Sequence, residues 1–306
     1  MFDPALPAPA APRPLDPAAP PPALARLAAP WLEPDAGPWQ LLTGGRTNRV
    51  WAAGDVICKS YDPDGATPLF ANDAGAEAAI LRHLSPNGLA PGLLAEVKAG
   101  QAGDARPAIL YRKAAGRPLA RPNAALIKAL SRVHALNPPA WLPPAPQGPR
   151  ALSDQCAPML AELPADLAAD LRSRRPDLPA PSGLAPSKPA LLHGDPVAAN
   201  AIEGADGQVT LVDWQCPASG DPVLDLATAL SPAMQITYGR APLEKTERQA
   251  LIAVYPEPGV RQRLGAWSAL LHWRMAVYCA WRGVRPGGDP ARARQAMTAE
   301  LAAAGL

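Results

Sequence analysis

The sequence is poor in cysteine, and its few thiols lie far apart. Four cysteines occur among 306 residues, and no two of them form a C-x-x-C pair; they are Cys58, Cys156, Cys216 and Cys279. This spacing argues against a disulfide framework and against a cysteine-ligated zinc site. We therefore expect a protein of a reducing compartment, the cytoplasm.

The sequence also lacks a strong net charge and a long apolar run. It has 29 basic and 27 acidic side chains, and its formal net charge of +2 gives no field that favours nucleic acid or a membrane surface. No stretch approaches the roughly 18 apolar residues of a membrane span, and the first residues do not resemble a signal peptide. Because 48% of the residues are hydrophobic, the chain has enough material for a buried core. We expect a soluble, globular protein.

The amino-acid composition of the chain changes after its first 38 residues. Proline and alanine dominate residues 1–38, a composition that disfavours helix interiors and strand ladders, so we expect this segment to be poorly ordered. Residues 39–114 contain short β-forming runs broken by glycine and aspartate, which predict an antiparallel sheet with strands over 39–43, 49–53, 55–61, 93–97 and 107–111. Apolar residues at helical spacing over 73–84 predict one helix among these strands.

Residues 115–306 have a mainly helical pattern. Helical spacing of apolar residues extends over 123–136, 152–162, 165–174, 247–254 and 260–281, and two short β-like runs occur at 190–193 and 209–213. The sequence therefore predicts an α+β fold of two lobes. A small N-terminal lobe holds an antiparallel sheet with one helix, and a larger C-terminal lobe is mainly helical.

Residues suited to phosphoryl transfer follow the two β-like runs. The segment LLHGDPVAAN contains Asp195 and Asn200, and Asp213 follows the second run. Phosphoryl transfer from ATP requires a metal ion on the triphosphate and a carboxylate that orients the incoming hydroxyl. Pro196 disfavours helical geometry at Asp195, so this carboxylate is expected to project from a loop as the base. Asn200 and Asp213 offer the hard oxygen ligands that Mg²⁺ prefers.

The order and spacing of these residues resemble the aminoglycoside phosphotransferase and choline kinase group. That group has an H-G-D-x-x-x-x-N motif, a later Asp followed by Trp or Phe, and a G-D-P-x-x-D-L-A motif, which are matched here at 193–200, 213–214 and 220–227. The resemblance implies a protein-kinase-like fold that uses ATP and Mg²⁺. It assigns Asp195 as the catalytic residue, with Asn200 and Asp213 as metal ligands.

Three further residues of these motifs are expected to support the site without reacting. His193 should form hydrogen bonds that shape the catalytic turn, rather than act as the base. Asp225 is expected to be buried and to accept backbone N–H bonds that brace the turn. Asp221 is assigned only to the surroundings of the site.

The N-terminal lobe contains residues that suit nucleotide binding. Lys59 ends the apolar run Val-Ile-Cys-Lys, and Glu77 lies on the following helix, as in kinases where a glutamate holds the lysine that contacts the α- and β-phosphates. The alternative is that both are solvated surface residues. The stretch LLTGGRTNRVW resembles the phosphate-covering loop of choline kinase-like and thiamine kinase-like members, although alone it could be an ordinary hairpin turn. The loop residues expected to contact the nucleotide are Gly44, Gly45, Arg46, Thr47 and Asn48.

A stripe of large side chains in residues 260–281 is a candidate acceptor site, although such a stripe more often belongs to the core. Aromatic faces attract quaternary or aromatic cations by about 0.5 to 2 kcal/mol per contact, which would suit choline or thiamine. A polycationic aminoglycoside would require carboxylates, and residues 260–281 contain none. The candidate acceptor residues are Trp267, Arg274, Tyr278 and Trp281.

The sequence thus predicts an enzyme that transfers the γ-phosphoryl group of MgATP to a hydroxyl of a small molecule. The acceptor classes considered are amino alcohols such as choline or ethanolamine, thiamine, and aminoglycoside-like compounds. A protein kinase is disfavoured, because only residues 214–219 separate Asp213 from the next motif and no A-P-E segment lies there. The alternative is a catalytically silent kinase-like module that binds nucleotide or a partner. Such modules generally lack a metal ligand or the base, and this chain has both.

Overall fold

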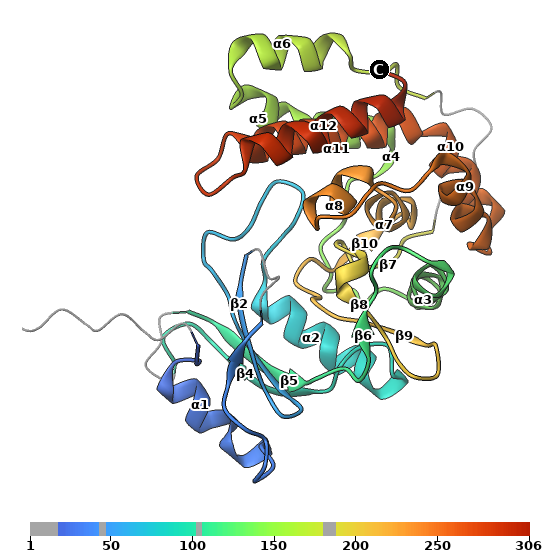
Figure 1. Cartoon of the computed structure of the whole chain (residues 1–306). Coiled ribbons are helices and arrows are strands. Elements are labelled where there is room, and N and C mark those ends of the chain that lie inside the picture. The colour runs from blue at the N-terminus through green and yellow to red at the C-terminus, as the bar shows by residue number, and fades with distance from the viewer. Residues whose placement is uncertain (1–17, 43–46, 102–105, 180–187) are drawn as a thin grey trace, which may run out of the picture.

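The N-terminal lobe is built on a five-stranded antiparallel sheet. The computed structural model describes residues 18–42, 47–101, 106–179 and 188–306, and it forms a β-rich lobe and a helical lobe (Figure 1). The strand order in the sheet is β1-β2-β3-β5-β4. The strands are β1 (Gln40–Leu41), β2 (Arg49–Ala53), β3 (Val56–Ser60), β4 (Leu93–Val97) and β5 (Ala108–Arg112). The predicted runs at 49–53 and 93–97 coincide with β2 and β4, and the other predicted strands are present with shifted ends.

Strand β3 is buried along its whole length because both faces of the sheet are covered. Its side chains alternate between the two faces. Val56 and Cys58 pack in a cluster on one face, whereas Ile57 and the following Tyr61 belong to the main core on the other. The same alternation directs Lys59 to the face of Ile57 and Tyr61, and that face also packs against helix α2 (Ala74–Leu84).

Helix α2 is the one helix predicted among the strands, and its start is fixed by a side-chain cap. The Asp73 carboxylate accepts a hydrogen bond from the Ala76 N–H at 3.0 Å, as expected for an aspartate at an N-cap. Ala78, Ile80, Leu81 and Leu84 are buried. The apolar spacing read from residues 73–84 therefore gave the correct element.

The expectation of an irregular N-terminal segment is wrong for residues 22–31. These residues form helix α1 (Pro22–Ala28) and a 3₁₀ turn (Ala29–Trp31), while residues 1–17 lie outside the described part of the chain. Pro22 is compatible with the first position of a helix, where its missing N–H has no intrahelical acceptor. Leu24 and Ala28, one turn apart, are fully buried in the cluster of Val56 and Cys58. Helix α1 thus covers the face of the sheet opposite α2 (Figure 1).

The C-terminal lobe is mainly helical, as predicted, with two small antiparallel sheets. One sheet has the order β6-β8-β9 and the other pairs β10 with β7. Its strands are β6 (Arg117–Pro118), β7 (Ala190–Leu192), β8 (Ala201–Glu203), β9 (Val209–Leu211) and β10 (Ala218–Gly220). Its helices are α3 (Ala124–His134), α4 (Gly148–Asp154), α5 (Cys156–Ala161), α6 (Ala165–Ser173), α7 (Val223–Ala229), α8 (Pro232–Thr237), α9 (Lys245–Val254), α10 (Pro258–Ala266), α11 (Ser268–Gly283) and α12 (Pro290–Ala304).

Two helices predicted as continuous are interrupted. The predicted helix over 260–281 is divided at Trp267, whose φ of −96° and ψ of 2° leave the helical range between α10 and α11. The predicted helix over 152–162 is divided at Gln155 into α4 and α5. Apolar spacing continues across both breaks, so periodicity alone could not locate them.

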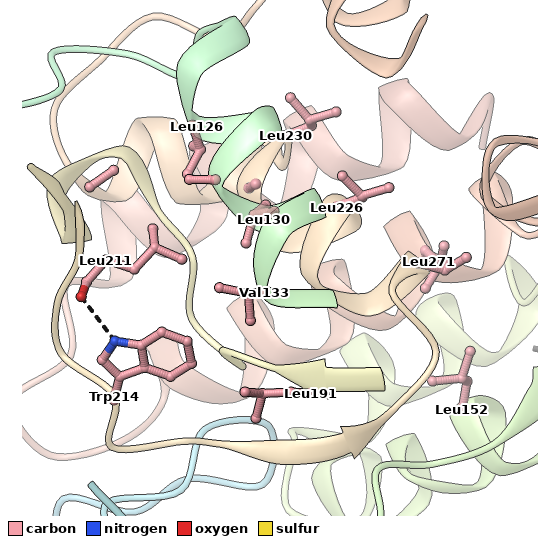
Figure 2. Close-up of a cluster of buried hydrophobic side chains, with 14 of the residues drawn as sticks. Leu126, Leu130, Val133, Leu152, Leu191, Leu211, Trp214, Leu226, Leu230 and Leu271 are labelled. Atoms are coloured by element: carbon pink, nitrogen blue, oxygen red, sulfur yellow. Dashed lines mark hydrogen bonds between the residues drawn. The ribbon is translucent and has the colours of Figure 1, made fainter. Parts of the chain in front are cut away.

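A hydrophobic cluster places the segments around strands β7 and β9 against the helices. Figure 2 shows side chains of α3 facing those of α7 and of strands β7 and β9. The indole N–H of Trp214 donates to the backbone oxygen of Leu211 at 2.9 Å, which ties the chain after β9 to this cluster. The labelled members are Leu126, Leu130, Val133, Leu152, Leu191, Leu211, Trp214, Leu226, Leu230 and Leu271. Among the described residues, no helix has both the length and the hydrophobicity required to cross a membrane.

Candidate active site

The turn after β7 is held by one buried carboxylate. Asp225, in the first turn of α7, accepts the N–H of His193 at 2.7 Å and the N–H of Gly194 at 2.9 Å. The backbone contacts predicted for Asp225 are therefore present. Burial raises its pKa, but the hydrogen bonds from His134 at 3.0 Å and from the His193 N–H outweigh this effect, so the pKa of Asp225 is lowered. An ionised Asp225 fixes the turn through both oxygens.

His193 shapes this turn, as predicted, through both ring nitrogens. Nδ1 accepts the Asp195 N–H at 3.2 Å, which leaves Nε2 as the donor to the Val212 backbone oxygen at 3.0 Å. The ring also packs on Trp214 with centroids 4.4 Å apart. Burial lowers the pKa of His193, which favours the neutral ring that these contacts require.

Asp195 presents an unpaired carboxylate oxygen. The residue is buried, and its Oδ1 has no hydrogen-bond partner among the described residues. Its backbone oxygen accepts the Val197 N–H and the Asn200 side-chain amide, both at 2.9 Å. Burial, and then the charges of Asp213 and Asp225, raise the pKa of Asp195 to about 7. A free acceptor oxygen with a pKa near neutrality suits a general base.

The two predicted metal ligands flank one β-hairpin. Asn200 ends a 3₁₀ turn before β8, and Asp213 follows β9; the Val212 N–H donates to the Asn200 backbone oxygen at 2.9 Å. Asp213 is the one described non-glycine residue with positive φ, at 65°, a conformation that aspartate tolerates better than most residues. Its side chain is 34% exposed. Amide and carboxylate oxygens fit the chemistry of Mg²⁺.

The described residues gather no group of three acidic, histidine or cysteine side chains that could hold a metal ion by themselves. A magnesium ion at phosphates usually keeps several waters and takes one or two protein ligands together with phosphate oxygens. Asn200 and Asp213 would be such a pair.

Lys59 joins the N-terminal lobe to Asp213 of the C-terminal lobe. Its ammonium lies 2.6 Å from Glu77 Oε2 and also contacts Asp213, and Lys59 and Glu77 are both almost fully buried. The predicted Lys–Glu pair is therefore present, and the alternative of two solvated residues is wrong. Burial lowers the pKa of Lys59, but the charges of Asp213 and Glu77 outweigh it and raise the pKa above its usual value.

Glu77 has two further contacts that the sequence did not reveal. The Tyr61 hydroxyl donates to its Oε2, and the Trp214 N–H donates to its Oε1 at 3.1 Å. The signal for Tyr61 was its position two residues after Lys59, which places both side chains on one face of the strand. Glu77 thus positions Lys59 and the chain next to Asp213 together.

The predicted phosphate-covering loop is described only in part. Gly44, Gly45 and Arg46 lie outside the described residues. The Asn48 amide donates to Gln215 at 2.6 Å and to Asn72 at 2.7 Å, so it links the base of the loop to the C-terminal lobe. Thr47 packs closely over Gly65, where an added Cβ would lie 2.2 Å from its methyl group. Nucleotide contacts by these five residues stay a prediction.

Asp221 forms a structural ion pair. Its Oδ2 accepts Arg263 Nε at 2.7 Å and its Oδ1 accepts Arg263 Nη2 at 3.2 Å, with both residues buried. Asp221 also accepts the Val223 N–H at 3.1 Å at the start of α7. The pair therefore fixes α10 to the segment that carries Asp225. Arg263 was not identified from the sequence, because nothing near it in the chain distinguishes it from an ordinary surface arginine.

The four candidate acceptor residues do not form one open surface. Trp267 and Trp281 are each 8% exposed and belong to the core. Arg274 donates to the Gln155 side chain at 2.8 Å. The rings of Tyr278 and Phe70 pack edge to face with their centroids 5.1 Å apart, and burial, with a smaller contribution from the Asp195 charge, raises the pKa of Tyr278 to about 12. Of the four, Tyr278 is thus electrostatically coupled to the candidate base.

The amino-acid sequence matches the model of a known protein family. The model of the phosphotransferase enzyme family matches residues 38–266. No curated protein sequence matches the chain significantly.

Solved structures share the fold at low sequence identity. A choline/ethanolamine kinase family protein from Mesorhizobium loti is 21% identical, with a TM-score of 0.59 over 92% of this chain and 97% of that chain. Choline kinase LicA from Streptococcus pneumoniae is 14% identical, with a TM-score of 0.59 over 91% and 98%. Spectinomycin phosphotransferase APH(9)-Ia, solved with ADP and spectinomycin, is 13% identical, with a TM-score of 0.55 over 92% and 96%. These similarities confirm the predicted protein-kinase-like, two-lobed fold.

Proposed function

This chain belongs to the phosphotransferase enzyme family, whose model matches most of its length, and on that premise we propose that it transfers the γ-phosphoryl group of ATP to a hydroxyl of a small molecule. One observation carries the proposal. The Lys59–Glu77 pair of one lobe meets Asp213 of the other, next to the turn that holds Asp195. These are the positioning and proton-accepting groups that phosphoryl transfer requires.

The nucleotide is proposed to lie between the lobes. Lys59, held by Glu77, orients the α- and β-phosphates, and Asn200 and Asp213 hold Mg²⁺. When bound, the ion neutralises charge on the triphosphate. A solved relative of this fold contains ADP, which supports a nucleotide as the phosphoryl donor.

Asp195 is proposed to receive or orient the proton of the acceptor hydroxyl. The hydroxyl oxygen then attacks the γ-phosphorus in line, a new O–P bond forms, and the bond from phosphorus to the β–γ bridging oxygen breaks, so that ADP leaves. Lys59 stabilises the negative charge of the phosphate oxygens. The unpaired Oδ1 of Asp195 is free to accept that proton.

Choline, ethanolamine and spectinomycin are named for proteins of similar structure, so they are the first acceptors to test, together with thiamine. We also propose that the protein is located in the cytoplasm, as expected from the cysteine spacing.

The test is ADP release from MgATP across a panel of amino alcohols, thiamine, sugar amines and aminoglycosides, with wild type and Asp195→Asn. One acceptor that raises turnover above the background rate, with this gain lost in Asp195→Asn, would support the assignment. Full activity of Asp195→Asn would show that the mechanism is wrong. A flat panel together with measured ATP binding would favour the catalytically silent module.

A further inference from the structure

A cavity of about 350 Å³ opens beside the catalytic turn. One wall is Val197, Ala198 and Ala199, which follow Asp195 in the chain, and the Val197 N–H donates to the Asp195 backbone oxygen at 2.9 Å. A second wall is the segment 118–122. The third wall is helix α8 and the turn after it. Because the first wall closely follows Asp195 in the chain, the cavity lies next to the backbone of the candidate base.

The ionisable side chains that line this cavity are basic, apart from the phenol of Tyr238. Arg121 and Arg240 line it, and within the described part of the chain no carboxylate does so. Arg121 is already paired with Glu247 at 2.9 Å. Arg240 is exposed and forms no ion pair with any described carboxylate, so its charge is available to a ligand.

The cavity also contains a buried hydrogen-bond acceptor with no donor. Gln235 lines it and is 5% exposed, and its Nε2 donates to the Ser231 backbone oxygen at 3.3 Å. Its Oε1 has no hydrogen-bond partner among the described residues. Buried carbonyl groups normally accept a hydrogen bond, so a ligand hydroxyl at this position would supply the donor that Oε1 of Gln235 lacks. Met234 and Val197 supply apolar walls around it.

The aromatic stripe predicted for a cationic acceptor is less suited to one. The Arg285 guanidinium lies 4.7 Å from the centre of the Trp281 ring, so the chain's own cation already occupies that face. Arg285 is further paired with Glu162, which also accepts the Trp281 indole N–H at 2.9 Å. A positive ligand would meet a positive side chain here.

Building on the proposed function, we propose that the cavity beside the catalytic turn binds the phosphoryl acceptor, and that this acceptor is a hydroxylated molecule with an anionic group. Arg240 binds the anion, Gln235 accepts a hydrogen bond from a hydroxyl, and the apolar walls enclose the carbon skeleton. The hydroxyl that reacts extends past Val197 to Asp195.

The test uses three probes that share one sugar ring and differ in charge: glucuronate, glucose and glucosamine. Binding to the full chain is measured by calorimetry in the presence of ADP and Mg²⁺, for wild type and Arg240→Gln. The control is Arg172→Gln, which removes the same charge from an exposed position on α6, outside the cavity. Gln235→Glu, which places a carboxylate in the cavity, is a second variant.

We expect glucuronate to bind about fivefold more tightly than glucose, and glucosamine to bind most weakly, because a partly exposed charge pair has an effect of this order. Arg240→Gln should remove the preference, Gln235→Glu should reverse it, and Arg172→Gln should leave it unchanged. Equal or tighter binding of glucosamine, no binding of glucuronate, or a preference that survives Arg240→Gln would overturn the inference.

ADP release separates this inference from the proposed function. If the charge preference is found but no acceptor supports release from MgATP, the function is wrong and the cavity still binds hydroxylated anions. If turnover occurs with cationic acceptors only, the function stands and the anionic acceptor is wrong.

Discussion

Asp195 occupies an environment that favours its protonated form. Burial, and then Asp213 and Asp225, raise its pKa from the ordinary value of 3.8 to about 7. A carboxyl group whose pKa is raised by folding stabilises the protein while it is protonated. That contribution is complete below pH about 4 and is lost as pH rises through about 7. The ionised form of Asp195, which the proposed mechanism uses as the base, therefore reduces the stability of the free protein.

Replacing Asp195 by Asn should consequently stabilise the free protein at alkaline pH while it abolishes turnover. At pH 8 the gain in free energy of unfolding is at most about 4 kcal/mol, the equivalent of the shift from 3.8 to about 7, and it should shrink towards pH 5. Turnover should fall at least about 100-fold. Urea unfolding at both pH values measures the first effect. Asp206→Asn, at an exposed turn, is the control, and equal stabilities of Asp195→Asn and wild type at pH 8 would contradict the assigned environment.

The same pKa predicts the pH dependence of activity. With the base protonated below pH about 7, kcat/KM should fall tenfold per pH unit on the acid side and level off above it. Initial rates at low acceptor concentration between pH 5 and 9 would show this limb. A profile that is flat across this range would assign the proton transfer to another group.

At the scale of elements, local sequence patterns correctly predicted the helices that begin at a capping residue. Asp73 and Asn123 both cap helices by accepting from a backbone N–H three residues later, and the starts of both helices were placed to within one residue. The break at Trp267 was missed, because apolar spacing continues on both sides of it. Helix α1 was missed because proline and alanine content hid the pair Leu24 and Ala28.

The candidate site shows the same division between local and long-range information. Motif residues near in sequence, such as His193 and Asp195, were identified, and the turn-shaping hydrogen bonds predicted for His193 are present. The partners that come from distant elements were not. Arg263 contacts Asp221 and Tyr61 contacts Glu77 only because the fold brings their elements together.

The turn at residues 193–195 requires glycine at position 194. Its φ is 85°, and an added Cβ would lie 2.1 Å from the Cys216 backbone oxygen, a contact that neither residue can relieve without moving the backbone. Gly194→Ala should therefore reduce both stability and turnover, because His193 and Asp195 move with it. Gly207→Ala is the matched control, since its φ of 73° carries the same penalty of about 1–2 kcal/mol but nothing lies within 4 Å. Thermal unfolding and initial rates measure the difference; equal effects of the two variants would show that the turn tolerates a side chain.

Helix α1 should contribute to stability through one face only. Leu24 is fully buried against the sheet, whereas Leu27, on the same helix, is 36% exposed. Leu24→Ala should cost about 2–4 kcal/mol through lost burial and a cavity, and Leu27→Ala less than about 1 kcal/mol. Urea unfolding of the two variants gives this comparison directly. Similar small losses would mean that α1 does not dock on the sheet in solution.

At the scale of the whole molecule, the two lobes meet at the Lys59–Asp213 ion pair and at the contacts around it. Lys59 contacts Asp213, Asn48 donates to Gln215, and the segment 61–73 extends from the sheet towards α11, where Phe70 meets Tyr278 (Figure 1). The groups proposed to bind MgATP therefore also connect the lobes. A ligand that engages Lys59 and Asp213 together should stabilise both lobes as one unit.

This arrangement predicts that MgATP raises the melting temperature of the wild type and that Asp213→Asn removes most of the rise. Ligand at about 100 times its Kd stabilises by about 2.7 kcal/mol. Asparagine tolerates the φ of 65° at this position, so the variant isolates the lost charge from any change of backbone. Asp206→Asn, at the opposite end of the β8–β9 hairpin, is the matched control and should keep the full shift. A shift that persists in Asp213→Asn would exclude this carboxylate as the metal ligand, whereas no shift in the wild type would favour a catalytically silent module that binds a partner instead of nucleotide.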